Sequence, residues 1–271
     1  MISTLSLFSL YIEMFYNDQK LSSGTGFLME SSAKIPYLIT NRHNFTGRNN
    51  ETNECMSRTQ AVPNRVEITH VRFSELINHW GYAVETGESF HFTEEMLAAL
   101  KERIIVSQPL YDEIEEPLWF EHPTLKESAD FLALKLTDLH DVHAISFTKQ
   151  FSVPLIIGVT ETVSVIGYPF GKSNNNFPVW ANGTIASDPL LDYNDLPIML
   201  IDCRSRGGQS GSPVFRHVTS GMASLENDNI QSVFSPLSRF LGIYSGRIHK
   251  DSDIGLVWKA STVYELIDSL P

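Results

Sequence analysis

Hydrophobic residues in this chain are concentrated in short runs rich in β-branched and aromatic side chains, bounded by Gly, Pro, Ser or charged residues. Runs of this kind are typical of β-strands, and their close spacing favours a barrel or sandwich over alternating strands and helices. The predicted strands are Leu5–Phe15, Gly26–Met29, Tyr37–Thr40, Val66–Phe73, Phe131–Leu136, Val163–Ile166, Val179–Ile185, Met199–Ile201, Pro213–Phe215, Leu241–Tyr244 and Leu256–Trp258.

Two segments carry a helical signal instead. In Thr93–Arg103, a candidate N-cap threonine precedes acidic residues, and basic residues end the segment, an order that complements the helix dipole. Ser261–Leu270 closes the chain, with Ser261 as its candidate cap. The strands form two sets on either side of Ala144–Pro154, so we expect an all-β fold in two halves.

Composition narrows the class of partners. The chain has 271 residues, 42% of them hydrophobic, enough for one large core or two modest ones. Its 32 acidic and 20 basic side chains give a net charge of −12. Because such a surface repels phosphate backbones and anionic lipid, we expect neither nucleic acid nor a membrane as partner. No apolar run reaches the roughly 18 residues that a membrane-spanning helix needs.

Three observations favour a cytoplasmic location. Two cysteines, Cys55 and Cys203, are too few for a disulfide framework, which predicts reduced thiols. The apolar N-terminus lacks the basic start and small-residue cleavage site of a secretory signal. Asn44 begins a glycosylation sequon directly after a candidate catalytic histidine, where a glycan would block the site.

The most informative segment is LIDCRSRGGQSGSPVF, from Leu200 to Phe215. An apolar strand leads into glycines and a serine, Ser210, and a second apolar strand follows. Serine is a weak nucleophile until a base takes its proton and donors stabilise the oxyanion. Glycines let the backbone bend so that successive N–H groups point at one spot, and Gly208 and Ser210 are the natural pair. A hairpin without chemistry is the competing interpretation of this segment alone.

Two other segments supply the partners that a serine nucleophile needs. The apolar segment from Pro36 ends at His43, and Asp130 stands at the start of a strongly apolar strand. A buried carboxylate there would accept a hydrogen bond from the imidazole and fix its tautomer. Each residue alone is more often structural. Together, in the order His43, Asp130 and Ser210, they indicate a catalytic triad.

With these landmarks the chain resembles the trypsin-like peptidases, and it looks closest to the bacterial high-temperature-requirement (Deg-type) branch. The resemblance covers nearly the whole chain, although no peptide-binding C-terminal domain follows. The matching motifs are GTGFL from Gly24, LITNRH ending at His43, ADFLALKL from Ala129, VIGYPFG from Val165, NGTIAS from Asn182, GQSGSP from Gly208, GIYSG from Gly242 and GLVWK from Gly255.

The family implies two six-stranded antiparallel β-barrels with the triad between them and a C-terminal helix. Residues 1–145 would form the first barrel, with a partly helical insertion at about 47–123, and residues 146–271 the second. The expected function is that of a serine endopeptidase acting on polypeptides without a cofactor or metal. By the same resemblance, Ser245 would support Asp130, and Gly246 would lie on the strand that pairs with bound peptide. A latent peptide-binding or regulatory module on this fold is the alternative.

Substrate specificity is less defined. In trypsin-like enzymes the residue six before the nucleophile usually forms the base of the primary pocket, and here that residue is Arg204. A cation there would favour an acidic side chain. A pocket that includes Ser205 would suit small or aliphatic residues, as in Deg-type relatives. Arg204 could also point away and pair with an acidic residue.

The insertion resembles no known motif. Much of the chain's acidic charge lies in residues 85–127, which could act as a lid, dock a protein partner or merely decorate the surface. His140 and His143 have no third ligand nearby, so a solvated turn is favoured over a metal site. The α/β-hydrolase class is excluded because Ser212 replaces the last glycine of its motif and the chain order of the triad differs.

Overall fold

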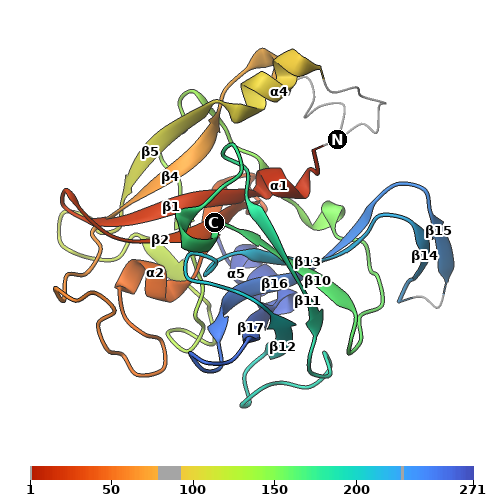
Figure 1. Cartoon of the computed structure of the whole chain (residues 1–271). Coiled ribbons are helices and arrows are strands. Elements are labelled where there is room, and N and C mark those ends of the chain that lie inside the picture. The colour runs from red at the N-terminus through yellow and green to blue at the C-terminus, as the bar shows by residue number, and fades with distance from the viewer. Residues whose placement is uncertain (1, 79–92, 227–228) are drawn as a thin grey trace.

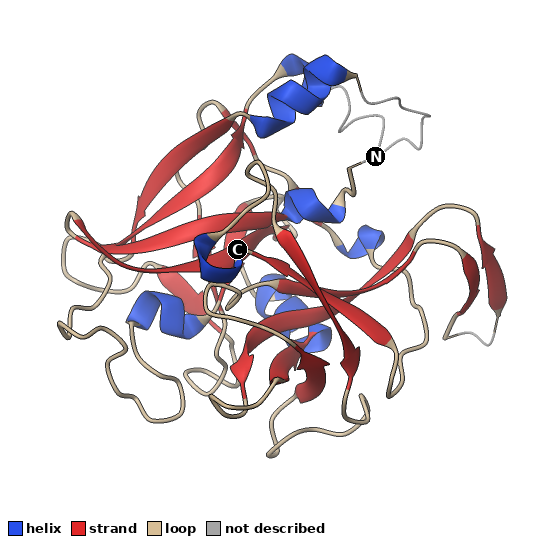
Figure 2. Cartoon of the chain, viewed as in Figure 1, coloured by secondary structure: helices blue, strands red, loops and turns tan. Residues whose placement is uncertain are grey.

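The computed structural model describes residues 2–78, 93–226 and 229–271. Strands dominate it, and the described helices are short (Figure 2). The first half is a curled sheet with the strand order β5-β4-β1-β2-β3-β7-β6, to which β8 and β9 add through β4 and β2. Its strands are β1 (Ser9–Tyr16), β2 (Gln19–Glu30), β3 (Pro36–Thr40), β4 (Arg65–Arg72), β5 (Arg103–Pro109), β6 (Trp119–Glu121), β7 (Leu132–Lys135), β8 (Val142–His143) and β9 (Ser146–Phe147).

The second half is a closed barrel in the order β10-β11-β12-β17-β16-β13, and β13 returns to pair with β10. A separate hairpin, β14–β15, projects from this barrel (Figure 1). The strands are β10 (Thr162–Gly167), β11 (Val179–Ile185), β12 (Ile198–Cys203), β13 (Pro213–Val218), β14 (Gly221–Ser224), β15 (Ile230–Val233), β16 (Leu237–Arg247) and β17 (Ile254–Lys259).

Short helices connect or flank the strands. They are α1 (Leu5–Phe8), α2 (Arg42–Thr46), α4 (Glu94–Lys101) and α5 (Ala260–Asp268), with 3₁₀ turns η1 (Lys149–Phe151) and η2 (Pro169–Gly171). The predicted N-cap of α4 is confirmed, because the Thr93 hydroxyl accepts a hydrogen bond from the backbone N–H of Met96 at 3.2 Å. No described helix is long and apolar enough to cross a membrane.

Alternation along the strands decides which side chains enter the core. In β1, Leu10, Ile12 and Met14 are buried together on one face, while Tyr11 and Glu13 on the other face are partly exposed. The residues before β1 depart from the predicted strand and form α1, whose Leu5 and Phe8 share one helical face and are both buried in the main core.

One aromatic core joins the two halves. Phe147 of β9 packs its ring against Phe8 at 5.5 Å, against Phe215 of β13 at 5.5 Å and against Phe240 of β16 at 4.9 Å between centroids. Phe27 of β2 also contacts Phe240, at 5.7 Å. Each ring removes a large apolar area from water, so these contacts hold the sheet and the barrel together.

The prediction of an all-β double barrel with a C-terminal helix is confirmed, with a different strand count in the first half. Within residues 2–78 and 93–147, that half has nine strands instead of six, two of them only two residues long. The range 47–123, expected as an insertion, supplies β4, β5 and β6, and β4 pairs directly with β1. These three strands of the range are therefore part of the sheet. Residues 85–92 of the acidic stretch lie outside the described residues.

Candidate active site

The pairing of β3 with β7 brings His43 close to Asp130. The strands run antiparallel, with Thr40 opposite Leu132. His43 follows β3 in the short helix α2, and Asp130 lies two residues before β7, so both lie at the same edge of the sheet. The neighbours Ala129 and Phe131 are fully buried, which fixes the position of Asp130.

Four hydrogen bonds surround Asp130. Its carboxylate contacts Nδ1 of the His43 ring at 2.7 Å and accepts the backbone N–H of His43 at 3.0 Å. The Ser245 hydroxyl donates to the same carboxylate. The amide of Asn41 donates to the Asp130 carbonyl at 2.6 Å. With a proton on Nδ1, the imidazole presents Nε2 as a free acceptor, which is the tautomer a general base requires.

Two opposing effects set the pKa of His43. Burial of the ring lowers the pKa, since it disfavours the charged form, whereas the negative charge of Asp130 and its hydrogen bond raise it. The raising effects win, so the pKa of His43 lies above its ordinary value of 6.5. Asp130 therefore makes the imidazole a stronger base than burial alone would leave it.

Ser210 lies in the loop that joins β12 to β13. Gly208 and Gly211 on either side have φ values of 93° and 87°, a region that side chains other than glycine rarely adopt. His43, Asp130, Ser210 and Ser245 all line one cavity of about 530 Å³. In the described part of the chain the Ser210 hydroxyl makes no hydrogen bond, and catalytic hydrogen bonds often tighten only when substrate binds.

The backbone N–H groups of residues 208–212 fall into two sets. Those of Gln209, Gly211 and Ser212 donate to the carbonyls of Arg206, Tyr244 and Gln209, at 3.2, 2.9 and 3.0 Å. Those of Gly208 and Ser210 have no partner among the residues that the structure describes. The loop therefore leaves unpaired the two N–H groups that the sequence predicts as an oxyanion hole.

The loop is anchored by residues to which sequence reasoning gave no role. Thr25 of β2 donates its N–H to the Ser210 carbonyl at 2.9 Å and its hydroxyl to the Gly208 carbonyl at 2.8 Å. The N–H of Phe170 in η2 donates to the Gly207 carbonyl at 2.6 Å. Thr25 and Phe170 are within the matched motifs GTGFL and VIGYPFG, but motif letters do not reveal which backbone atoms a residue holds.

Two of the four residues predicted to bind substrate line the cavity, and two do not. Ser245 and Gly246 line it, whereas Arg204 and Ser205 do not. The Arg204 side chain is exposed, and Ser205 is fully buried with its hydroxyl bonded to the Tyr244 hydroxyl. The cavity instead contains Arg247, which the sequence did not single out.

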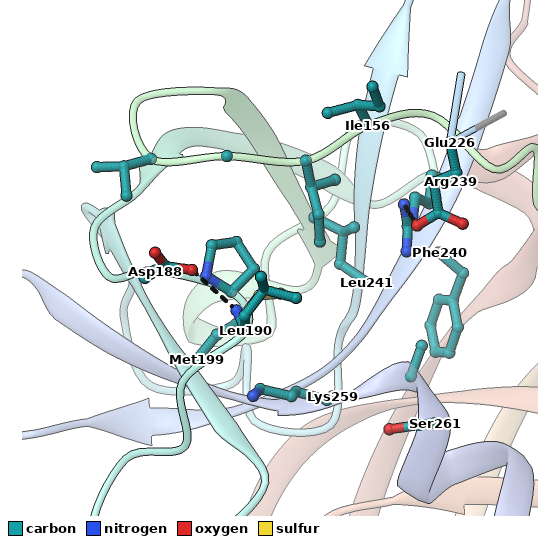
Figure 3. Close-up of a pocket in the computed structure, with 15 residues that line it drawn as sticks. Ile156, Asp188, Leu190, Met199, Glu226, Arg239, Phe240, Leu241, Lys259 and Ser261 are labelled. Atoms are coloured by element: carbon teal, nitrogen blue, oxygen red, sulfur yellow. Dashed lines mark hydrogen bonds and ion pairs between the residues drawn. The ribbon is translucent and has the colours of Figure 1, made fainter. Parts of the chain in front are cut away.

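A second cavity, of about 450 Å³, lies on the second barrel and contains none of the triad candidates. Figure 3 shows Arg239 directed at Glu226 across its rim, with Leu190, Leu241 and Met199 around the hollow. Arg239 forms an ion pair with Glu226, and Lys259 pairs with Asp192 at 2.6 Å. The cationic side chains of this cavity therefore already have carboxylate partners.

The trypsin-like peptidase domain family matches residues 24–220, a range that contains His43, Asp130 and Ser210. The chain belongs to this family and is a serine-type endopeptidase, whose substrates are polypeptides.

Solved structures are similar at low sequence identity. The active form of the Rv3671c protease from M. tuberculosis is 16% identical, with a TM-score of 0.47 over 97% of this chain and 80% of that chain. The inactive form of the same protease is 16% identical, with a TM-score of 0.43 over 97% and 88%. A serine endoprotease from Yersinia pestis is 12% identical, with a TM-score of 0.47 over 98% and 65%. No curated protein matches the chain.

Proposed function

We propose that the chain hydrolyses internal peptide bonds with His43, Asp130 and Ser210 as its triad and the N–H groups of Gly208 and Ser210 as its oxyanion hole. The observation that carries the proposal is the double contact of the Asp130 carboxylate with His43, in the cavity that also contains Ser210. Such a contact fixes both the orientation and the tautomer of the imidazole.

In this mechanism the Ser210 hydroxyl attacks the peptide carbonyl while Nε2 of His43 takes its proton. Asp130 stabilises the imidazolium that forms, and the two free N–H groups stabilise the oxyanion of the tetrahedral intermediate. Collapse of this intermediate breaks the C–N bond, and His43 returns the proton to the leaving amine. Water then attacks the acyl-enzyme ester, again with His43 as base, and releases Ser210.

The anchoring of the loop supports this use of Gly208. A trans peptide is planar, so its C=O and N–H point in opposite directions. Phe170 holds the Gly207 carbonyl at 2.6 Å, and the Gly208 N–H of the same peptide therefore points away from η2. This orientation supports a preformed donor, which costs no reorganisation during the reaction.

The proposal is tested by replacing the nucleophile. Ser210→Ala is expected to lower kcat on an internally quenched peptide by several orders of magnitude, because residual catalysis then comes only from the oxyanion hole and from binding. Ser128→Ala removes an exposed hydroxyl from the same cavity and serves as the matched control, with near wild-type turnover. Equal turnover in wild type and Ser210→Ala would contradict the assignment.

A latent binding module on the same fold is the second candidate. The observation that favours it is that, among the described residues, the Ser210 hydroxyl makes no hydrogen bond to the His43 ring. A latent module would bind peptides without turnover in the wild type. The turnover experiment therefore separates the two functions.

We also propose that the protein works where Asn44 is not glycosylated, as in the cytoplasm. Asn44 is buried and its amide donates to the Thr40 hydroxyl at 3.0 Å. A glycan on this nitrogen would require that contact and the local packing to break. For the acidic residues 112–116, the described structure gives an exposed turn between β5 and β6, and a lid or docking role for them stays a prediction.

A further inference from the structure

We propose that the cavity beside Ser210 binds an acidic side chain of the substrate on the N-terminal side of the scissile bond, and that Arg247 holds its carboxylate. The inference rests on the proposed function, because it assigns specificity to the same site. It also moves the source of acidic selectivity from Arg204, which is exposed and does not line the cavity, to Arg247, which does.

The position of Arg247 follows from the end of β16. Ser245, which bonds to Asp130, is followed by Gly246 and Arg247, so the cation is two residues along the strand from the triad's support. Arg247 pairs with Gly255 of β17 at the end of this strand. A Cβ atom added to Gly246 would meet nothing within 4 Å, so the cavity is open along this strand.

The charges of the cavity leave Arg247 without a carboxylate. Asp130 is committed to His43 and Ser245, and Glu51 is exposed on the loop after α2. The contact of the Arg247 guanidinium within the described residues is with the Ser252 carbonyl, at a long 3.4 Å. Neither Arg247 nor Lys250 has an acidic partner in the described ranges of the chain. Arg239 and Lys259 of the other cavity are both paired.

A half-buried guanidinium with free donors is a receptor for a carboxylate. Its planar fork matches the two carboxylate oxygens, and the bidentate pair is stronger than a neutral hydrogen bond. Lys250, at the exposed rim, adds a second positive charge. These two cations balance the two carboxylates of the cavity, Asp130 and Glu51, whereas the chain as a whole carries a net charge of −12.

The rest of the lining suits the stem of a glutamate. Leu196, Ile198, Leu256 and Trp258 provide apolar wall, against which the methylene groups of glutamate can pack. The same wall lowers the local dielectric and strengthens the ion pair. A lysine side chain would be repelled by Arg247, and an aliphatic side chain would leave the guanidinium unpaired.

The test uses fluorogenic peptides that carry Glu, Gln, Val or Lys in turn at each of the four positions before the scissile bond. At one position, kcat/KM for Glu should exceed that for its isostere Gln by about 10- to 100-fold, the usual worth of a hydrogen bond to a charged group. Arg247→Ala and the longer Arg247→Gln should both reduce this ratio to near one, while the Gln peptide is still cleaved. Arg204→Ala is the control and should leave the ratio unchanged.

Several outcomes overturn the inference while leaving the peptidase function intact. They are a Glu-to-Gln ratio near one in the wild type, a ratio that survives in both Arg247 variants, and a preference for Lys. If no peptide is cleaved, the proposed function fails, and binding of the same peptides to Ser210→Ala then tests the subsite alone. Tighter binding of Glu than of Gln, lost with Arg247→Ala in that background, supports the subsite, and equal binding overturns it.

Discussion

At the scale of single residues, the central pair is His43 and Asp130. The Asp130 carboxylate accepts hydrogen bonds from the ring Nδ1 of His43, the backbone N–H of His43 and the Ser245 hydroxyl. These three bonds fix its orientation toward the imidazole. Burial and the carboxylate act on the His43 pKa in opposite directions, and the carboxylate prevails. The imidazole therefore depends on Asp130 for its basicity.

This balance gives a pH dependence. His43 acts as base only when neutral, so activity is present above its pKa and is lost as pH falls through it. Because that pKa is raised, the acid limb of kcat/KM should have its midpoint above 6.5. With Asp130→Asn, burial alone remains, and the midpoint should move below that of the wild type, with kcat reduced by about 10⁴-fold. A pH profile of kcat and kcat/KM on an uncharged peptide measures the midpoint and the loss of kcat. A wild-type midpoint below that of Asp130→Asn would refute the pairing of His43 with Asp130.

At the scale of elements, the loop between β12 and β13 is shaped by neighbours on both sides. Thr25 in β2 binds two of its carbonyls, and η2 binds a third through Phe170. Both neighbours are far from Ser210 in sequence, so the active loop needs the sheet and the barrel to be folded against each other.

Two adjacent glycines of this loop make a matched pair of variants. A Cβ atom at Gly208 would lie 2.4 Å from the Tyr168 carbonyl oxygen, at a φ of 93°. Gly208→Ala should therefore displace the peptide and lower kcat by about 10²- to 10³-fold, the effect of losing one oxyanion donor. A Cβ atom at Gly207 would meet nothing within 4 Å, so Gly207→Ala should leave kcat nearly unchanged. The test is the steady-state kcat of the two variants on the same peptide. Similar losses of kcat in both would argue against a specific role for Gly208.

The sequence was sufficient for some elements of the site and not for others. His43, Asp130 and Ser210 stand where apolar strands begin or end, a pattern visible in the residue order, and the structure brings all three to one cavity. Arg247 was missed because its place depends on the register of β16 against β17, which shifts between Tyr244 and Gly246. The strands β4 and β5 were assigned to an insertion, since their pairing with β1 joins residues far apart in sequence.

At the scale of the whole molecule, the two halves share one hydrophobic core, and the last residue of the chain is bound to the first half. Aromatic rings from β2, β9, β13 and β16 pack together, and α5 reaches across to the first sheet. The carbonyl of Pro271 accepts hydrogen bonds from the Ser31 hydroxyl at 2.9 Å and the Tyr37 hydroxyl at 3.2 Å. We therefore expect the two halves to unfold together.

Phe147→Ala tests this expectation. Removing a fully buried ring that contacts both halves should cost about 3–5 kcal/mol of unfolding free energy. For a chain of this size that corresponds to a fall of roughly 10 °C in Tm, in a single transition. Phe234 is 97% exposed, and Phe234→Ala should leave Tm unchanged. Thermal unfolding followed by circular dichroism gives the comparison, and two separate transitions would contradict a shared core.

The most direct test of the account is covalent labelling by a fluorophosphonate, followed by mass spectrometry of the labelled peptide. The phosphonyl group is attacked only by a serine whose base and oxyanion hole are assembled, because the adduct resembles the tetrahedral intermediate. We predict one adduct, on Ser210, in the wild type, and none in Ser210→Ala or His43→Ala. Absence of an adduct on folded wild type, or labelling that persists in His43→Ala at the wild-type rate, would contradict the proposed triad.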